Sequence, residues 1–208
     1  MRRGALIAFA LLFAATWWRP QWPAEQALHH SLTVLGLGLL FWVQRRRPLP
    51  RSSFLLVLAF LALHTVAARW LYSAVPYDDW TDALFGVRLS DALGWRRNHF
   101  DRLVHLAYGL CLGPVLCRHL REALRWPAVW AALGAVTVVT ATGALYELLE
   151  WGVSLLAPPE LAEAYNGQQG DLWDAQKDMA IALLGVAVSA TVFDPGLRRY
   201  RRRAVDRA

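Results

Sequence analysis

Carboxylates recur at helical spacing in two stretches of this sequence. GQQGDLWDAQKD (167–178) carries Asp171, Asp174 and Asp178, and ALYELLEW (144–151) carries Glu147 and Glu150. Residues three or four positions apart share one face of an α-helix, so each stretch presents its carboxylates to one side. Carboxylates suit Mg²⁺ and Mn²⁺, and carboxylates together with imidazole also suit Zn²⁺ or Fe²⁺. These residues are therefore candidates for a divalent metal site.

A third stretch adds imidazole and guanidinium groups to these acids. RNHFDRLVH (97–105) holds Asp101 and His105 one helical turn apart. In an enzyme, His105 or His99 would act as the general base, and Arg69 or Arg102 would bind a phosphate group. The candidates that join the five carboxylates in the wall of a pocket are His64, Arg69, His99, Asp101, Arg102 and His105.

The elements that position these residues are apolar blocks. Hydrophobic residues make up 56% of the 208-residue chain, against about 45–50% in soluble domains. Since a membrane-spanning helix needs roughly 20 mostly apolar residues, we expect six spans, at about 4–18, 28–44, 53–72, 100–118, 128–151 and 173–193. The predicted fold is all-α: a polytopic membrane bundle of about six transmembrane helices. It forms one integral membrane domain (1–208), with an extracytoplasmic loop at 73–99 and a basic cytoplasmic tail at 194–208.

The first span has two interpretations. Arg2 and Arg3 precede an apolar run, as in a secretory signal peptide. The run ends in TWWRP (16–20), which lacks the small-residue pattern of a cleavage site. We therefore expect a retained helix, with a cleaved signal as the alternative.

The orientation follows from the basic residues, because cytoplasmic loops are rich in Lys and Arg. With the N-terminus inside, the cytoplasmic segments hold 15 of the 22 Lys and Arg residues but only three of the 16 Asp and Glu residues. This predicts a multi-pass protein of the bacterial inner (plasma) membrane with both termini cytoplasmic. The bilayer is the expected partner, with anionic lipid at the basic cytoplasmic face. Nucleic acid is not expected, and the oligomeric state is left open.

The predicted topology brings the polar residues to one depth. The fourth span begins outside with Asp101 and His105, the fifth ends outside, and the sixth begins outside; the third ends there with His64 and Arg69. Ionisable residues within a membrane usually face a bundle interior or water. We therefore expect an outward-facing intramembrane pocket of carboxylates and histidine. The hypothetical metal ligands in it are Glu147, Glu150, Asp171, Asp174, Asp178 and His105.

A purely structural interpretation explains part of this pattern. Aspartate at a helix N-terminus complements the macrodipole and caps free N–H groups, which accounts for Asp171. It does not account for Glu147 and Glu150 at a C-terminal helix end, nor for Asp178 farther along its helix. His29 and His30 are expected at the membrane interface. The loop 73–99 is expected to fold over the pocket or to lie in the interface as a short amphipathic helix.

The three polar stretches resemble the YjdF family of predicted bacterial inner-membrane proteins, with His64-Thr65 as a weaker match. The similarity extends over nearly the whole chain. It departs from the family pattern at Tyr165-Asn166 and at Lys177, where bulky apolar or aromatic residues are usual. DRLVH (101–105) also weakly resembles the D-K-x-x-H element of VanZ-like membrane proteins. The resemblance implies a six-helix membrane protein and no particular activity.

Three classes of function stay open, and it is uncertain whether the protein is an enzyme. A metal-dependent membrane enzyme acting on a lipid or phosphate-bearing substrate predicts a closed set of carboxylates around a metal. A transporter or ion-binding protein predicts a water-lined continuation below Asp178. A non-catalytic scaffold predicts that each carboxylate is paired with Arg or Lys.

Overall fold

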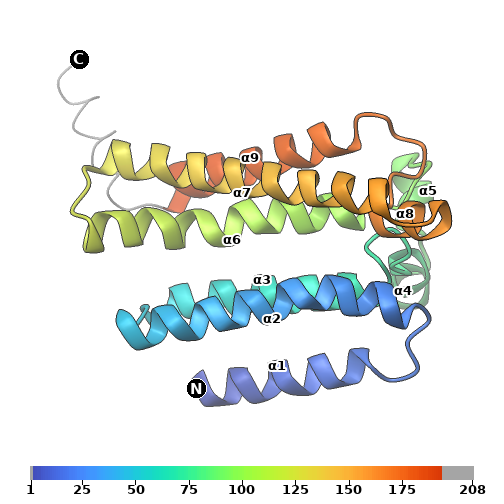
Figure 1. Cartoon of the computed structure of the whole chain (residues 1–208), viewed down its shortest axis with the longest axis horizontal. Helices are drawn as coiled ribbons and strands as arrows, with labels where there is room; N and C mark the ends of the chain where they lie inside the picture. Colours follow the sequence, from blue (N-terminus) through green and yellow to red (C-terminus); the bar gives the residue numbers. More distant parts are fainter. Residues whose placement is uncertain (1, 194–208) are drawn as a thin grey trace.

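The computed structural model describes residues 2–193, apart from the side chains of residues 160, 161, 163, 164 and 191–193. The predicted basic tail, 194–208, lies outside the described residues. All the regular secondary structure in the described part of the chain is helical, and there are no strands among these residues. Its long helices lie side by side along the longest axis of the molecule (Figure 1).

Four of these helices are long and apolar enough to cross a membrane. They are α2 (Pro23–Arg46), α3 (Arg51–Arg69), α6 (Phe100–Ala123) and α7 (Ala128–Leu156). The other two predicted spans are also helices, α1 (Arg2–Thr16) and α9 (Asp174–Phe193). However, α1 has only 15 residues, and α9 carries three charged residues in its first two turns. The all-helical membrane fold is therefore confirmed, and six spans stay a prediction.

Prolines set where several helices begin. Pro23 is the first residue of α2, while Pro50 and Pro127 immediately precede α3 and α7. Proline suits the first turn of a helix because its missing N–H would have no partner there. The connections before α3 and α7 are short, so these helices run antiparallel to the ones that precede them.

The long helices form two layers that meet where α3 packs on α6. One layer contains α1, α2 and α3, and the other contains α6, α7 and α9 (Figure 1). The second layer is held by a close approach of two parallel helices. A Cβ atom on Gly109 of α6 would lie 2.5 Å from the Val186 nitrogen of α9, and one on Gly185 would lie 2.5 Å from the Leu106 carbonyl oxygen. Such small-residue contacts are typical of packed membrane helices.

This contact fixes the register of the charged residues. Arg102 precedes Gly109 by seven residues on α6, and Asp178 precedes Gly185 by seven residues on α9. Two parallel helices that touch at the glycines therefore still face each other two turns earlier, where Arg102 and Asp178 meet.

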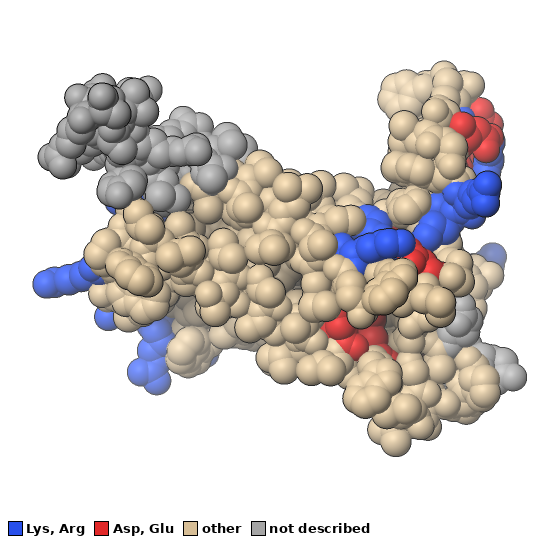
Figure 2. Space-filling model, turned by 90° about the horizontal axis from the view of Figure 1, so that it is seen from above, with Lys and Arg blue, Asp and Glu red and all other residues tan. Residues whose placement is uncertain are grey.

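Short helices gather at one end of the bundle, which we call the short-helix end. They are α4 (Tyr77–Phe85), α5 (Leu89–Leu93) and α8 (Pro159–Asn166) (Figure 1). The predicted loop 73–99 thus contains two helices, and Leu84 and Phe85 at the end of α4 are 74% and 76% exposed. Exposed apolar side chains beside charged ones are typical of a helix lying in a membrane interface. In Figure 2 the visible acidic residues also gather at this end.

Candidate functional site

Two arginines join α6 to the first turns of α9. Arg102 donates from Nη1 to the Asp174 carbonyl oxygen at 2.9 Å and pairs with the Asp174 carboxylate. The same Nη1 lies 2.6 Å from Oδ1 of Asp178, as an ion pair without hydrogen-bond geometry. Arg97 donates to the carboxylates of Asp174 and Asp101. Buried charges are stable when they are paired in this way, so this arginine–aspartate network accounts for three of the carboxylates.

Asp171 lies at the edge of the network, just before α9. Its carboxylate accepts hydrogen bonds from Lys177 Nζ at 2.7 and 2.8 Å, and Oδ1 accepts the Trp173 N–H at 3.1 Å. The hydrogen bond from Lys177 and the one from Trp173 hold the pKa of Asp171 below its usual value of 3.8. Asp171 therefore has a structural role at the beginning of the helix.

The glutamates of α7 are in a different situation. Among the described residues, neither Glu147 nor Glu150 forms an ion pair with Lys or Arg. The Glu147 side chain is only 9% exposed, and its Oε1 lies 3.8 Å from Nε2 of His105. This oxygen has no hydrogen-bond partner. Burying a carboxylate oxygen without a partner costs free energy. The arginine–aspartate network does not offset this cost for Glu147.

Two groups of three side chains have the spacing of metal ligands. His105, Glu147 and Asp178 each offer one ligand atom, and these atoms lie within 4.8 Å of one another. Asp101, Asp174 and Asp178 meet the same criterion. In the second group, Arg97 and Arg102 already pair with all three carboxylates, whereas in the first group only Asp178 has such a partner. The first group, with one imidazole and two carboxylates, has the donors that Zn²⁺, Mn²⁺ or Fe²⁺ accept.

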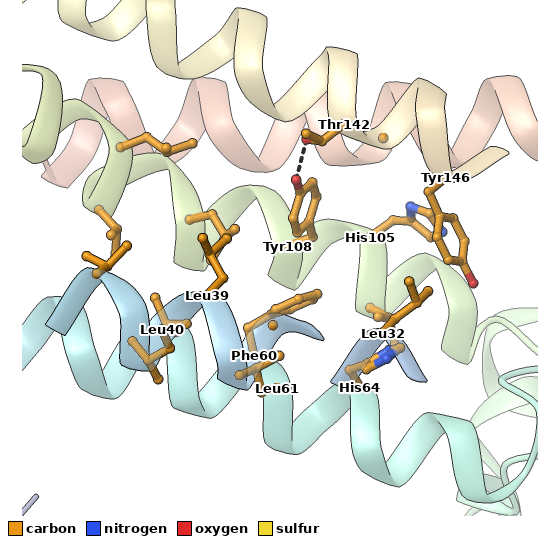
Figure 3. Close-up of a pocket in the computed structure, with 18 of the residues that line it drawn as sticks. Leu32, Leu39, Leu40, Phe60, Leu61, His64, His105, Tyr108, Thr142 and Tyr146 are labelled. Carbon is orange, nitrogen blue, oxygen red and sulfur yellow. Dashed lines mark hydrogen bonds between the residues drawn. The ribbon is translucent and has the colours of Figure 1, made fainter. Parts of the chain in front are cut away.

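A large apolar cavity adjoins the first group. Its volume is about 410 Å³, and it lies between α2 and α3 on one side and α6 and α7 on the other (Figure 3). Leucines and Phe60 line most of it, and His64, His105 and Tyr146 lie together at one end (Figure 3). A small polar cavity continues from that end, and Tyr72, His105 and Tyr146 line both.

A second large cavity reaches the acids from another side. Its volume is about 660 Å³, and it lies between α7, α8 and α9. Glu147, Glu150 and Asp174 are part of its wall. The two glutamates are thus accessible from this cavity, although little of their surface is exposed.

His64 belongs to a histidine–tyrosine group behind the acids. Its Nε2 donates to the His29 carbonyl oxygen at 3.3 Å, so its Nδ1 accepts the hydrogen bond of the Tyr72 hydroxyl. His29 is fully buried, and its ring stacks on Tyr165 of α8 with centroids 4.4 Å apart. The expected place of His29 and His30 at the membrane interface stays a prediction, but neither side chain is exposed: α8 covers His29, and His30 packs inside the bundle against Phe13.

His99 and Arg69, the other two candidates, belong to neither group of possible metal ligands. His99 precedes α6 with its ring against Trp95, and burial together with the positive charge of Arg97 lowers its pKa from 6.5. Arg69 points away from the acids, since its Nη2 donates to the Arg19 carbonyl oxygen at 2.9 Å.

The structure therefore brings together most of the predicted residues. Those that converge are Asp101, Arg102, His105, Glu147, Glu150, Asp174 and Asp178. Arg97, Tyr72 and Tyr146 were missed. Arg97 stands four residues before Asp101 in the same polar stretch, which is the spacing of a helical ion pair, and this signal was available in the sequence.

Comparison with known proteins agrees with the sequence resemblance. Residues 1–199 match the family described as "Predicted membrane protein (DUF2238)". The inner membrane protein YjdF of Escherichia coli (strain K12) is 32% identical over 176 residues, which cover 84% of this chain and 78% of that protein. No solved structure matches significantly.

Proposed function

This chain belongs to the YjdF (DUF2238) family of membrane proteins, and from its own site we propose that it binds a divalent metal ion in an outward-facing intramembrane pocket. The ligands are Nε2 of His105 and one carboxylate oxygen each of Glu147 and Asp178. The observation that carries the proposal is the buried Oε1 of Glu147, which has no hydrogen-bond partner and lies 3.8 Å from Nε2 of His105.

The local charge supports a cation as the missing component. Six carboxylates lie at the site, and the cations beside them are Arg97, Arg102 and Lys177. With every group ionised, negative charges exceed positive ones by three, and a divalent ion would offset two of them. Uncompensated charge of this kind is expensive in a low-dielectric environment, so the site favours cations.

A continuous ion pathway is not supported by the packing below Asp178. Along the seam from Asp178 toward the other end, α9 presents Ala182 and Val186 to the glycines of α6, and both are buried. Within the described residues, this seam offers only Ser189 as a polar side chain, and its hydroxyl donates to the Gly109 carbonyl oxygen. We therefore favour a binding site that opens to one side of the membrane.

The proposal includes a topology. α1, α2, α3, α6, α7 and α9 cross the bilayer with both termini in the cytoplasm, and the short-helix end faces outward. Support comes from the asymmetry of basic residues, with Arg47, Arg118 and Arg121 at the opposite end. Anionic lipid would bind at that basic end.

The metal would keep an open position. Three protein ligands leave at least one coordination site for an outside oxygen, as in catalytic zinc centres. Arg102, which pairs with Asp178, would add positive charge beside an anion bound there. Metal-dependent chemistry on a lipid or phosphate-bearing substrate would use this position.

Metal content tests the proposal. The full chain is purified in detergent, incubated with Zn²⁺, Mn²⁺ or Fe²⁺, desalted and analysed by mass spectrometry of the elements. About one equivalent is expected in the parent and in Glu122→Gln, an exposed glutamate paired with Arg118. Glu147→Gln and Asp178→Asn should lose it while retaining a cooperative thermal transition. A metal-free parent, or a Glu147→Gln variant that retains the metal, overturns the proposal.

A further inference from the structure

The apolar cavity is too large and too apolar to be an ordinary packing defect. Its volume of about 410 Å³ falls within the roughly 300–1,000 Å³ of small-molecule sites. Leu39, Leu40, Phe60 and Leu61 form much of its wall (Figure 3). Water does not fill apolar cavities, which bind apolar molecules instead. In a bilayer the available apolar molecule is a hydrocarbon chain.

The cavity is also long. On α6 its lining runs from Val104 to His119. At 1.5 Å per residue these positions lie about 22 Å apart along the helix axis. One leaflet contributes about half of the roughly 30 Å hydrocarbon core. The cavity therefore has the length of a single extended chain that passes the bilayer midplane.

The two ends of the cavity differ in what they offer a polar head group. At the first end, Tyr72, His105 and Tyr146 also line the polar cavity that contains Asp178. At the other end lies a cavity of about 110 Å³ beside Arg47 and Arg118. Those arginines are already engaged, since Arg118 pairs with Glu122 at 2.9 Å and Arg47 donates to the Ala123 carbonyl oxygen. The end with the open metal position is therefore the better place for a head group.

We propose that the ligand of the metal site is an amphiphile with one long hydrocarbon chain and an anionic oxygen head group. The hydrocarbon chain lies in the cavity between the two layers, and the head group lies beside His105 and Tyr146, facing the open position of the metal. This inference rests on the proposed metal site for the head group, whereas the cavity alone accounts for the chain. A phosphate and a carboxylate share the required chemistry.

The chain offers a filling variant and a matched control. A Cβ atom on Gly143 of α7 would meet no atom within 4 Å, and Gly143 lines the cavity. Gly143→Leu therefore places an apolar side chain in the cavity, with open space at its Cβ position. Gly38 of α2 is exposed and also has open space around its Cβ position. Gly38→Leu makes the same change on a surface away from the cavity.

Binding is measured by isothermal titration of the detergent-purified, metal-loaded full chain. The probes are palmitoyl lysophosphatidic acid, palmitic acid and inorganic phosphate. The lysophosphatidic acid or the palmitic acid should bind the parent and Gly38→Leu equally, and at least tenfold more tightly than inorganic phosphate. Gly143→Leu should weaken that binding at least tenfold while its metal content stays at the parental value. The stronger of the two lipids identifies the head group.

The two proposals fail in different ways. If the parent holds metal but binds neither lipid, or if Gly143→Leu binds as well as the parent, the amphiphile is excluded and the metal site stands. If lipid binding is weakened by Gly143→Leu but is unchanged in Asp178→Asn, the head group does not reach the metal. The proposed orientation of the hydrocarbon chain in the cavity is then wrong. A parent without metal overturns the proposed function itself.

Discussion

At the scale of single residues, Glu147 and Asp174 are buried to the same extent but differ in whether their carboxylates have ion-pair partners. Their side chains are 9% and 8% exposed. Asp174 is held by Arg97 and Arg102, whereas Glu147 has only the imidazole of His105 nearby, at 3.8 Å. The same carboxylate chemistry is therefore structural in one position and unsatisfied in the other.

This contrast predicts opposite effects on stability. Asp174→Asn leaves two buried guanidinium groups short of an anion and should destabilise the metal-free protein by about 3–5 kcal/mol, the usual cost of breaking a buried pair. Glu147→Gln removes an uncompensated buried charge and should leave the metal-free protein unchanged or more stable. Melting temperatures in detergent, measured after treatment with a chelator, check both. Equal destabilisation by the two variants would show that Glu147 has a partner of its own.

His99 predicts part of the pH dependence. Burial first, and Arg97 second, lower its pKa below the ordinary value of 6.5, so the folded protein favours the neutral imidazole. A lowered pKa contributes stability that is fully present above about pH 6.5 and is lost as the pH falls further. The melting temperature should therefore fall between pH 7 and pH 5, and it should fall less in His99→Gln. Superimposable pH profiles for the two proteins would contradict this role.

At the scale of elements, the parallel contact between α6 and α9 decides whether the site forms. The Cβ atom of an alanine at position 109 would collide with the α9 backbone, including the Val186 nitrogen at 2.5 Å. Overpacking of this kind costs about 1–3 kcal/mol, and it would also separate Arg102 from Asp178. Gly109→Ala should therefore lower the melting temperature and reduce metal binding. Gly143→Ala, whose Cβ meets open space, should do neither; equal behaviour of the two variants would refute the register argument.

The positions of the helices along the chain were predictable because they follow from apolar length. Each predicted span overlaps a helix, and the depth of the acids follows from their distance to the helix ends. The direction in which each side chain points was less predictable, because it depends on packing between helices that are far apart in the sequence. Arg69 has the right depth but turns to the Arg19 carbonyl oxygen. In the sequence, Tyr165 stands out only as a departure from the family pattern, yet its side chain is buried and stacks on His29.

The sequence also did not show which of the acids in the candidate site pair with arginine and which do not. The sequence predicts the acids as one set, because their spacing and depth are alike. Only the contacts separate the aspartates held by Arg97 and Arg102 from Glu147. The signal for Arg97 existed in its four-residue spacing to Asp101, but this arginine precedes the predicted span, so its proximity to the acids depended on the fold.

At the scale of the whole molecule, the two layers and the gathered short helices predict how the chain lies in the membrane. In spheroplasts, a membrane-impermeant maleimide should label Ser90→Cys in a background where Cys111 and Cys117 are replaced by Ala. Arg125→Cys should react only after the membrane is permeabilised, because the proposed topology places the short α6–α7 connection in the cytoplasm. Labelling of Arg125→Cys in intact spheroplasts would invert the proposed topology.

The parallel packing of α6 and α9 also has a consequence for biogenesis. Of the described helices, α9 leaves the ribosome last, and domains form as their segments emerge. Until Asp174 and Asp178 arrive, Arg97 and Arg102 lack two of the anions with which they pair in the folded protein. The nascent chain therefore inserts with its charges unbalanced, and its last helix closes the site. A truncated chain that ends before α9 would keep this charge imbalance, and we expect quality-control proteases to degrade it.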